Sequence, residues 1–218
     1  MSIGYWWSDG LRRKQMARAG ITRDGLARVG AELADEIGFA RVTLAEVARR
    51  CGVQTPSLYS HVASTAELGR SVGMLALTEM ADRAAEAIAG LSRRDALEGL
   101  ANSYRDYARA HPGRFEASSV PLDAQSAAES AGPRHARFTA AILRGYDLDP
   151  EAEVHAVRML GSTIRGFITL ELNGSFDHSS PPPAQSWQRI IDALDALLSD
   201  WPASTTPTSR DEDLHDKA

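Results

Sequence analysis

The stretch VTLAEVARRCGVQTPSLYSHV, residues 42–62, decides the fold of this chain. Its first half predicts a short amphipathic helix, because four apolar residues between positions 44 and 51 fall on one face at i, i+3, i+4 and i+7. Thr43 can cap this helix, and Glu46 has the spacing of a capping box with it. Gly52 allows the tight turn that ends the helix. A second short helix is expected over residues 56–61, so that the two form a helix-turn-helix.

The second helix of this motif predicts DNA binding. In a helix-turn-helix, the first helix holds the second above the surface, where it can enter a major groove about 12 Å wide. The alternative is a surface helical hairpin with polar, solvent-facing residues. The glycine turn, the capping box and the rings of Tyr59 and His61 on the polar face favour DNA binding. The residues expected to face outward are Gln54, Thr55, Ser57, Tyr59 and His61.

Helical periodicity recurs outside this stretch and strand signals are nearly absent, so we expect an all-α fold with about nine helices. An N-terminal three-helix bundle with the helix-turn-helix should span residues 22–64, and a C-terminal helical domain residues 65–201. Residues 1–21 are expected to form a flexible arm and residues 202–218 a disordered tail. The expected helices lie at about 22–37, 43–51, 56–61, 65–89, 95–110, a short element near Phe115, 132–146, 151–172 and 184–200.

Composition excludes several other classes of protein. Hydrophobic residues make up 43% of the chain, but no run approaches the roughly 18 apolar residues of a membrane span. The N-terminus lacks a signal-peptide pattern, so a cytoplasmic location is expected. Cys51 is the single cysteine, which rules out an intrachain disulfide and disfavours a zinc site. The six histidines are scattered and no nucleophile or phosphate-loop motif is present, so we expect no enzyme activity, metal or cofactor.

Charge is distributed unevenly along the chain. Residues 1–62 carry nine arginines and lysines against six acids, whereas the whole chain has a formal net charge of −5. The N-terminal part is therefore net basic and the remainder net acidic. A basic head on an acidic body is typical of a nucleic-acid reader whose body does not touch the nucleic acid.

The N-terminal motifs have a specific order: a helix, a Gly-Phe bend, T-L-x-x-V-A-x-x-C-G-V, then P-x-L-Y-x-H-V and x-x-E-L. In this order, residues 25–69 resemble the DNA-binding region of the TetR family of regulators. The resemblance implies a homodimeric repressor that a small-molecule effector releases from a palindromic double-stranded DNA operator. The chain departs from the family at Ala63-Ser64-Thr65, where Pro-Ser-Lys is common and the lysine binds phosphate. A helical ligand-binding or adaptor protein that has lost DNA binding is therefore the alternative.

Carried over by position, the resemblance implies contacts to bases and to phosphates. Gln54, Thr55 and Ser57 would face base edges, with the glutamine amide suited to adenine. Tyr59 and His61 would donate hydrogen bonds to phosphates. Further phosphate contacts would come from Thr43 at a helix N-terminus, from Arg41, Arg49 and Arg50, and from Arg12, Arg13 and Lys14, which either reach a minor groove or stay solvated.

Two segments of the C-terminal half resemble a TetR C-terminal subfamily. They are YRDYARAHPGRF, residues 104–115, and RGFITLELNG, residues 165–174. The first carries the subfamily's Tyr-x-x-x-Ala-x-x-His-Pro-Gly motif. In the second, Arg165 stands where the subfamily has the histidine of a His-Gly-Phe motif, so a ligand role based on that histidine does not transfer.

A ligand pocket is expected among the helices of the C-terminal domain, and a dimer interface on its last two helices. An aromatic and methionine-rich pocket would suit a hydrophobic or planar effector. For each pocket candidate, ordinary core packing is the alternative. The pocket candidates are Met74, Leu77, Tyr104, Tyr107, Phe115, Phe138, Met159, Thr163, Arg165, Phe167 and Glu171. For the interface, packing within a single chain is the alternative. The interface candidates are Gly161, Gly166, Trp187, Ile191, Leu194 and Leu198.

Overall fold

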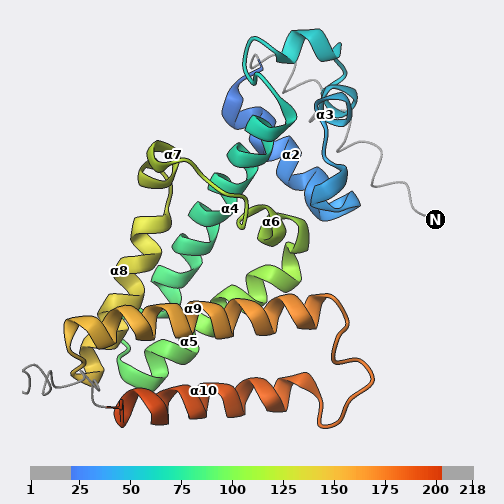
Figure 1. Cartoon of the computed structure of the whole chain (residues 1–218). Helices are drawn as coiled ribbons and strands as arrows, with labels where there is room; N and C mark the ends of the chain where they lie inside the picture. Colours follow the sequence, from blue (N-terminus) through green and yellow to red (C-terminus); the bar gives the residue numbers. More distant parts are fainter. Residues whose placement is uncertain (1–20, 203–218) are drawn as a thin grey trace, which may run out of the picture.

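The computed structural model describes residues 21–202, and all regular secondary structure in that range is helical (Figure 1). This confirms the expected all-α fold, with nine α-helices among these residues. None of the helices in this range is both long and apolar enough to cross a membrane. The α-helices are α2 (Arg23–Ile37), α3 (Leu44–Cys51), α4 (Thr65–Ala87), α5 (Arg93–Ala110), α6 (Pro112–Ala117), α7 (Ala124–Glu129), α8 (Gly132–Leu143), α9 (Pro150–Leu172) and α10 (Pro183–Ser199). The 3-10 helices are η1 (Phe39–Arg41), η2 (Thr55–Leu58) and η3 (Arg144–Tyr146).

Side-chain caps and a left-handed glycine fix the helix-turn-helix. The Thr43 hydroxyl accepts a hydrogen bond from the Glu46 backbone N–H at 3.2 Å, which starts α3. Gly52 ends α3 with φ of 71°, in the left-handed region that a side chain disfavours. The capping box is only half formed, because the Glu46 carboxylate accepts from Arg49 instead of from the Thr43 backbone.

Two elements differ from the sequence-based expectation. The second helix of the motif is the 3-10 helix η2, and it is followed by a turn in which the His61 N–H donates to the Leu58 carbonyl. It is therefore shorter than a helix over residues 56–61. The helix α7 was not among the helices expected from the sequence. It begins where the Asp123 carboxylate accepts from the Ser126 N–H at 2.8 Å.

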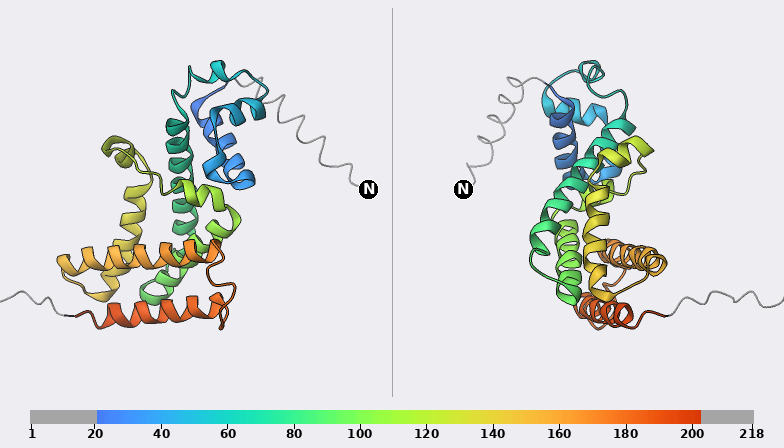
Figure 2. Two further views of the ribbon diagram at one scale, coloured as in Figure 1. Left: turned by 45° about the vertical axis from the view of Figure 1, so that its right-hand side comes forward. Right: turned by 90° about the vertical axis from the view of Figure 1, so that its left-hand side faces the viewer.

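The two apolar cores of the molecule are joined by α4. Leu68 and Val72, in its first half, belong to the N-terminal core with α2, α3 and η2. Met80 and Ala84, in its second half, belong to the C-terminal core with α5, α8, α9 and α10. Figures 1 and 2 show α4 running from the helix-turn-helix into the body, with α9 and α10 lying alongside each other across its far end. The two cores are thus built around one continuous helix.

The short helix α6 also contacts both parts, and the His-Pro-Gly segment explains why. Pro112 begins α6, and Gly113 lies buried against α2. A Cβ atom at position 113 would lie only 2.0 Å from the backbone carbonyl oxygen of Ala34. Only glycine permits this approach. Ala117 of α6 joins the N-terminal core, while Phe115 joins the C-terminal core.

Candidate functional site

The polar face predicted for the second helix of the motif is solvent-exposed. Leu58 and Val62 are buried and anchor η2 and the turn after it to the N-terminal core. With these two facing inward, the Tyr59 side chain projects outward and is 56% exposed. Gln54, Ser57 and His61 are exposed and Thr55 is half-buried.

Charged groups around this face are partly neutralised within the chain. Arg41 is exposed at the end of η1. Arg49 donates to the Glu46 carboxylate at 3.0 Å, and Arg50 forms an ion pair with Glu36. Two of the three expected arginines are therefore engaged with acids. The arm residues Arg12, Arg13 and Lys14 lie outside the described residues.

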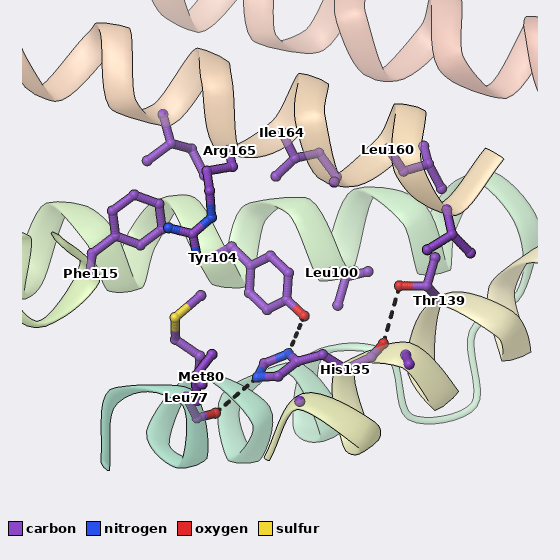
Figure 3. Close-up of a pocket in the computed structure, with 15 residues that line it drawn as sticks. Leu77, Met80, Leu100, Tyr104, Phe115, His135, Thr139, Leu160, Ile164 and Arg165 are labelled. Atoms are coloured by element: carbon purple, nitrogen blue, oxygen red, sulfur yellow. Dashed lines mark hydrogen bonds between the residues drawn. The ribbon is translucent and has the colours of Figure 1, made fainter. Parts of the chain in front are cut away.

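A cavity of about 330 Å³ lies in the body, where α4, α5, α6, α8 and α9 meet (Figure 3). Its wall is mostly aliphatic and aromatic, with a few polar side chains. This composition and size match a small-molecule site. The lining residues are Leu77, Met80, Leu100, Tyr104, Phe115, Gly132, His135, Ala136, Thr139, Val157, Leu160, Gly161, Ile164, Arg165 and Ile168.

A hydrogen-bonded chain crosses one side of the cavity, as Figure 3 shows. The His135 Nε2 lies 2.9 Å from the backbone carbonyl oxygen of Leu77, so Nε2 carries the proton and donates it. Its Nδ1 then accepts from the Tyr104 hydroxyl at 2.5 Å. Burial lowers the pKa of His135 and raises that of Tyr104. Both groups are therefore neutral at pH 7.

Arg165 places a positive charge at the same cavity. Its guanidinium reaches from α9 past the ring of Phe115, 4.6 Å from the ring centroid. It donates to the hydroxyl of Ser119 at 2.5 Å and to that of Ser118 at 3.1 Å. Burial lowers the pKa of Arg165, although an arginine stays charged at physiological pH. The cavity thus holds a cation beside neutral, self-satisfied polar groups.

Four of the eleven predicted pocket residues line this cavity: Leu77, Tyr104, Phe115 and Arg165. The other seven lie elsewhere. Met74 faces a separate polar hollow between α2, α4 and α7. Tyr107 is buried and donates to Glu79, and Glu171 binds Arg105 and Arg109. Phe138 and Met159 pack against the C-terminal core, Phe167 lies inside it, and Thr163 is half-buried on α9.

Sequence reasoning missed most of the wall that α8 and α9 provide. On α9, Val157, Leu160, Ile164 and Ile168 line the cavity at helical spacing. That spacing could have found them as a single face. His135 carried no such signal, because a lone histidine on a helix gives no indication of what lies opposite it.

The candidates for a dimer interface fall into two groups. On α10, Trp187, Ile191, Leu194 and Leu198 are buried in the core of a single chain, where a second copy could not reach them. The α9 glycines Gly161 and Gly166 differ, because a Cβ atom at either position would meet nothing within 4 Å in the described chain. Apolar side chains of the two helices that remain exposed are Val154, Leu170, Leu172 and Leu197.

Comparison with known proteins agrees with this architecture. The family "Bacterial regulatory proteins, tetR family" matches residues 26–72, and "Tetracyclin repressor-like, C-terminal domain" matches residues 97–194. An uncharacterized HTH-type transcriptional regulator of Mycobacterium tuberculosis is 32% identical over 167 residues, covering 75% of this chain and 77% of the relative. The regulator YobS of Bacillus subtilis, also uncharacterized, is 26% identical over 160 residues, covering 73% of this chain and 84% of YobS.

Solved structures share the fold at low identity. A TetR variant from Acinetobacter baumannii in complex with minocycline superposes with a TM-score of 0.66 at 19% identity, covering 85% of this chain and 100% of that one. BioQ with its double-stranded DNA operator gives a TM-score of 0.63 at 17% identity, covering 83% of this chain and 99% of that one.

Proposed function

Because this chain belongs to the TetR family of helix-turn-helix DNA-binding transcriptional regulators, a family of non-enzymes, we propose that it is an effector-released repressor. In this proposal a homodimer binds a palindromic operator in the bacterial cytoplasm. A small molecule in the cavity of the body then weakens that binding. BioQ with its operator and the TetR variant with minocycline are precedents for the two ligands on this fold.

On DNA, η2 would enter the major groove with its first residues nearest the bases. Gln54, Thr55 and Ser57 precede or open η2, so they would face base edges. Tyr59 and His61 follow η2 and would donate to the phosphates that flank the groove. Thr43 would place the N-terminal end of α3 against a phosphate. Its hydroxyl oxygen accepts from the Glu46 N–H, so the hydroxyl proton can be donated to that phosphate.

The observation that carries effector release is that α4 and α6 each belong to both cores. Leu77 and Met80 of α4 line the cavity, and two turns earlier Leu68 and Val72 pack against the DNA-reading part. An effector that prefers a shifted position of α4 would therefore move the reading elements of both protomers. The size of this preference sets the loss of DNA affinity. A typical coupling free energy of about 1–3 kcal/mol would lower the affinity for DNA roughly 5–150-fold.

The helix α6 gives a second route of coupling between cavity and DNA. Phe115 lines the cavity, whereas the neighbouring Arg114 and His111 bind Asp35 of α2. The Arg114 backbone N–H also donates to Asp35 at 3.0 Å. A displacement of Phe115 would thus shift the contacts of α6 with α2, which packs directly against the helix-turn-helix.

Dimerisation would use the outer face of α9 together with α10. Gly166 leaves space for a close helix approach, whereas Gly161 lines the cavity, and Leu170 and Leu197 supply exposed apolar area. Burying this apolar area against a second copy would stabilise the dimer by roughly 25 cal/mol per Å². Two reading heads one helical turn apart, about 34 Å, would then match a palindrome.

The C-terminal domain is best assigned to the subgroup with the His-Pro-Gly motif. Support comes from Gly113, whose contact with Ala34 requires glycine, and from Tyr104 and His111 at the spacing of that motif.

The test is recovery of DNA sites from genomic fragments of the source organism with the purified full chain. We expect a small set of palindromic sites, bound with a steep dependence on salt because phosphates are contacted. Arg137→Gln, which replaces an exposed arginine of α8, should bind them unchanged. A protein that enriches no sequence, or binds all fragments equally, would instead be a ligand-binding or adaptor protein.

A further inference from the structure

The cavity contains a cation that no carboxylate neutralises. Within residues 21–202, the polar contacts of the Arg165 guanidinium are the hydroxyls of Ser118 and Ser119, and its other close contact is the ring of Phe115. Arg165 is half-buried, and the buried Arg105 behaves differently. It donates two hydrogen bonds to the Glu171 carboxylate, at 2.8 and 2.6 Å. Buried charges are normally paired in this second way.

The other polar groups of the wall cannot supply the missing negative charge. Tyr104 and His135 are neutral and satisfy each other and the Leu77 carbonyl. Thr139 donates its hydroxyl proton to the backbone carbonyl of His135. The rest of the wall is apolar. The guanidinium has five N–H donors, and the two serines accept only two hydrogen bonds in total.

From this arrangement we propose that the effector is a small apolar monocarboxylate whose carboxylate binds Arg165 and whose body lies against the aliphatic wall. The inference rests on the proposed function, because it specifies the ligand of the same cavity. A carboxylate fits the planar fork of one guanidinium by two parallel hydrogen bonds. The lining residues include no second cation, so a phosphate with two charges would remain half neutralised. A volume of about 330 Å³ is near the lower end of the usual range for ligand pockets.

Binding of the carboxylate would also change the contacts of α6. The serines that hold Arg165 lie directly after α6, and the Ser118 hydroxyl donates to the Phe115 carbonyl at 2.7 Å. A carboxylate that binds the remaining N–H donors would draw the guanidinium toward the cavity and weaken the hydrogen bonds from Arg165 to both serines. The end of α6 is then held less tightly. Effector charge and α6 position are therefore coupled through one side chain.

The experiment measures binding to the full chain without DNA, by calorimetry, with three matched pairs of probes. Octanoate, decanoate and 1-naphthoate are each compared with the corresponding primary amide, which keeps the shape and removes the charge. We expect at least one carboxylate to bind tenfold or more tightly than its amide. In Arg165→Gln that preference should fall to about twofold or less, a loss typical of one charge-assisted contact.

Controls separate charge from folding. Arg158→Gln removes an exposed arginine from the same helix and should keep the preference. Arg165→Lys keeps a cation and should retain part of it, which covers the case in which the glutamine variant does not fold. The inference is overturned if no carboxylate binds, if amides bind equally well, or if Arg165→Gln keeps the preference. A chain that shows the preference but recovers no operator sites would instead count against the proposed function alone.

Discussion

Tyr59 and His61 are exposed in the turn after η2, and this position predicts their part in DNA affinity. In the Tyr59→Phe, His61→Ala double variant, two donors to phosphate are lost. Affinity should fall roughly tenfold or more on every DNA sequence, since hydrogen bonds to charged groups contribute about 1.5–3 kcal/mol each. The slope of log affinity against log salt should change little, because that slope counts the phosphates neutralised by lysine and arginine. Fluorescence anisotropy over a salt series measures both quantities.

Gln54 serves as the contrasting variant, because it faces bases rather than phosphates in this geometry. Gln54→Ala should cost about 1–3 kcal/mol at one operator position and leave binding to unrelated DNA unchanged. The salt slope should stay as in the parent protein. Equal losses on operator and unrelated DNA would show that the glutamine does not read a base.

His135 predicts a dependence of stability on pH. Its pKa is lowered by burial from an unfolded value near 6.5, so the unfolded chain takes up the proton first as pH falls. The stability contributed by the neutral ring is complete above about pH 6.5 and is lost as pH falls toward the lower folded pKa. Thermal unfolding from pH 7.5 to 5 should therefore show a smaller loss for His135→Gln than for the parent chain. The exposed His155→Gln variant should follow the parent; a parent-like curve for His135→Gln would contradict the assignment.

The helix α6 makes its own prediction through Gly113. In Gly113→Ala the new methyl group would clash with the Ala34 carbonyl, 2.0 Å away, so α6 must move away from α2. Overpacking of this kind costs about 1–3 kcal/mol, which denaturant unfolding can measure. Operator affinity should fall as well, because α2 carries the reading head. Glu116→Ala, exposed on the same helix, should change stability by less than about 0.5 kcal/mol.

How far the sequence predicts each element depends on whether its signal is local. Thr43, Gly52 and the buried stripe of α3 act within a few residues, so the helix-turn-helix could be predicted almost in full. The helix α7, AQSAAE, has no apolar stripe and no buried residue, and therefore gave no periodicity to detect. Periodicity on α10 revealed an apolar face around Trp187 but not what covers it. The covering surface is α5, with Asn102 accepting from the indole N–H at 2.7 Å.

The same distinction decides which cavity residues were predictable. Tyr104 and Phe115 lie in a recognisable motif, so their helices could be placed. The α9 residues of the opposing wall share one helical face, but which helices meet that face depends on packing between segments far apart in the sequence, and helix periodicity does not contain that information. Arg165 was among the pocket candidates, but the absence of an acid beside it in the described chain could be seen only in three dimensions.

The assembly leads to a prediction about the surface that remains exposed on α9 and α10. Leu170 is 47% exposed and Leu197 39%, so neither is needed for the fold of one chain. In the Leu170→Glu, Leu197→Glu double variant each protomer would bring two carboxylates to a face that meets its own copy. Like charges placed opposite each other cost several kcal/mol. The dimer dissociation constant should therefore rise at least about tenfold, as measured by sedimentation equilibrium, while the thermal unfolding of the monomer is preserved.

The control and the DNA readout make this prediction decisive. Leu91→Glu replaces a leucine with the same 47% exposure in the turn between α4 and α5, outside both helices. It should leave the dimer intact. If the double variant stays dimeric, the interface lies elsewhere on the molecule. If it becomes monomeric, operator binding should weaken much more than binding to a single half-site, because only a dimer holds two reading heads about 34 Å apart.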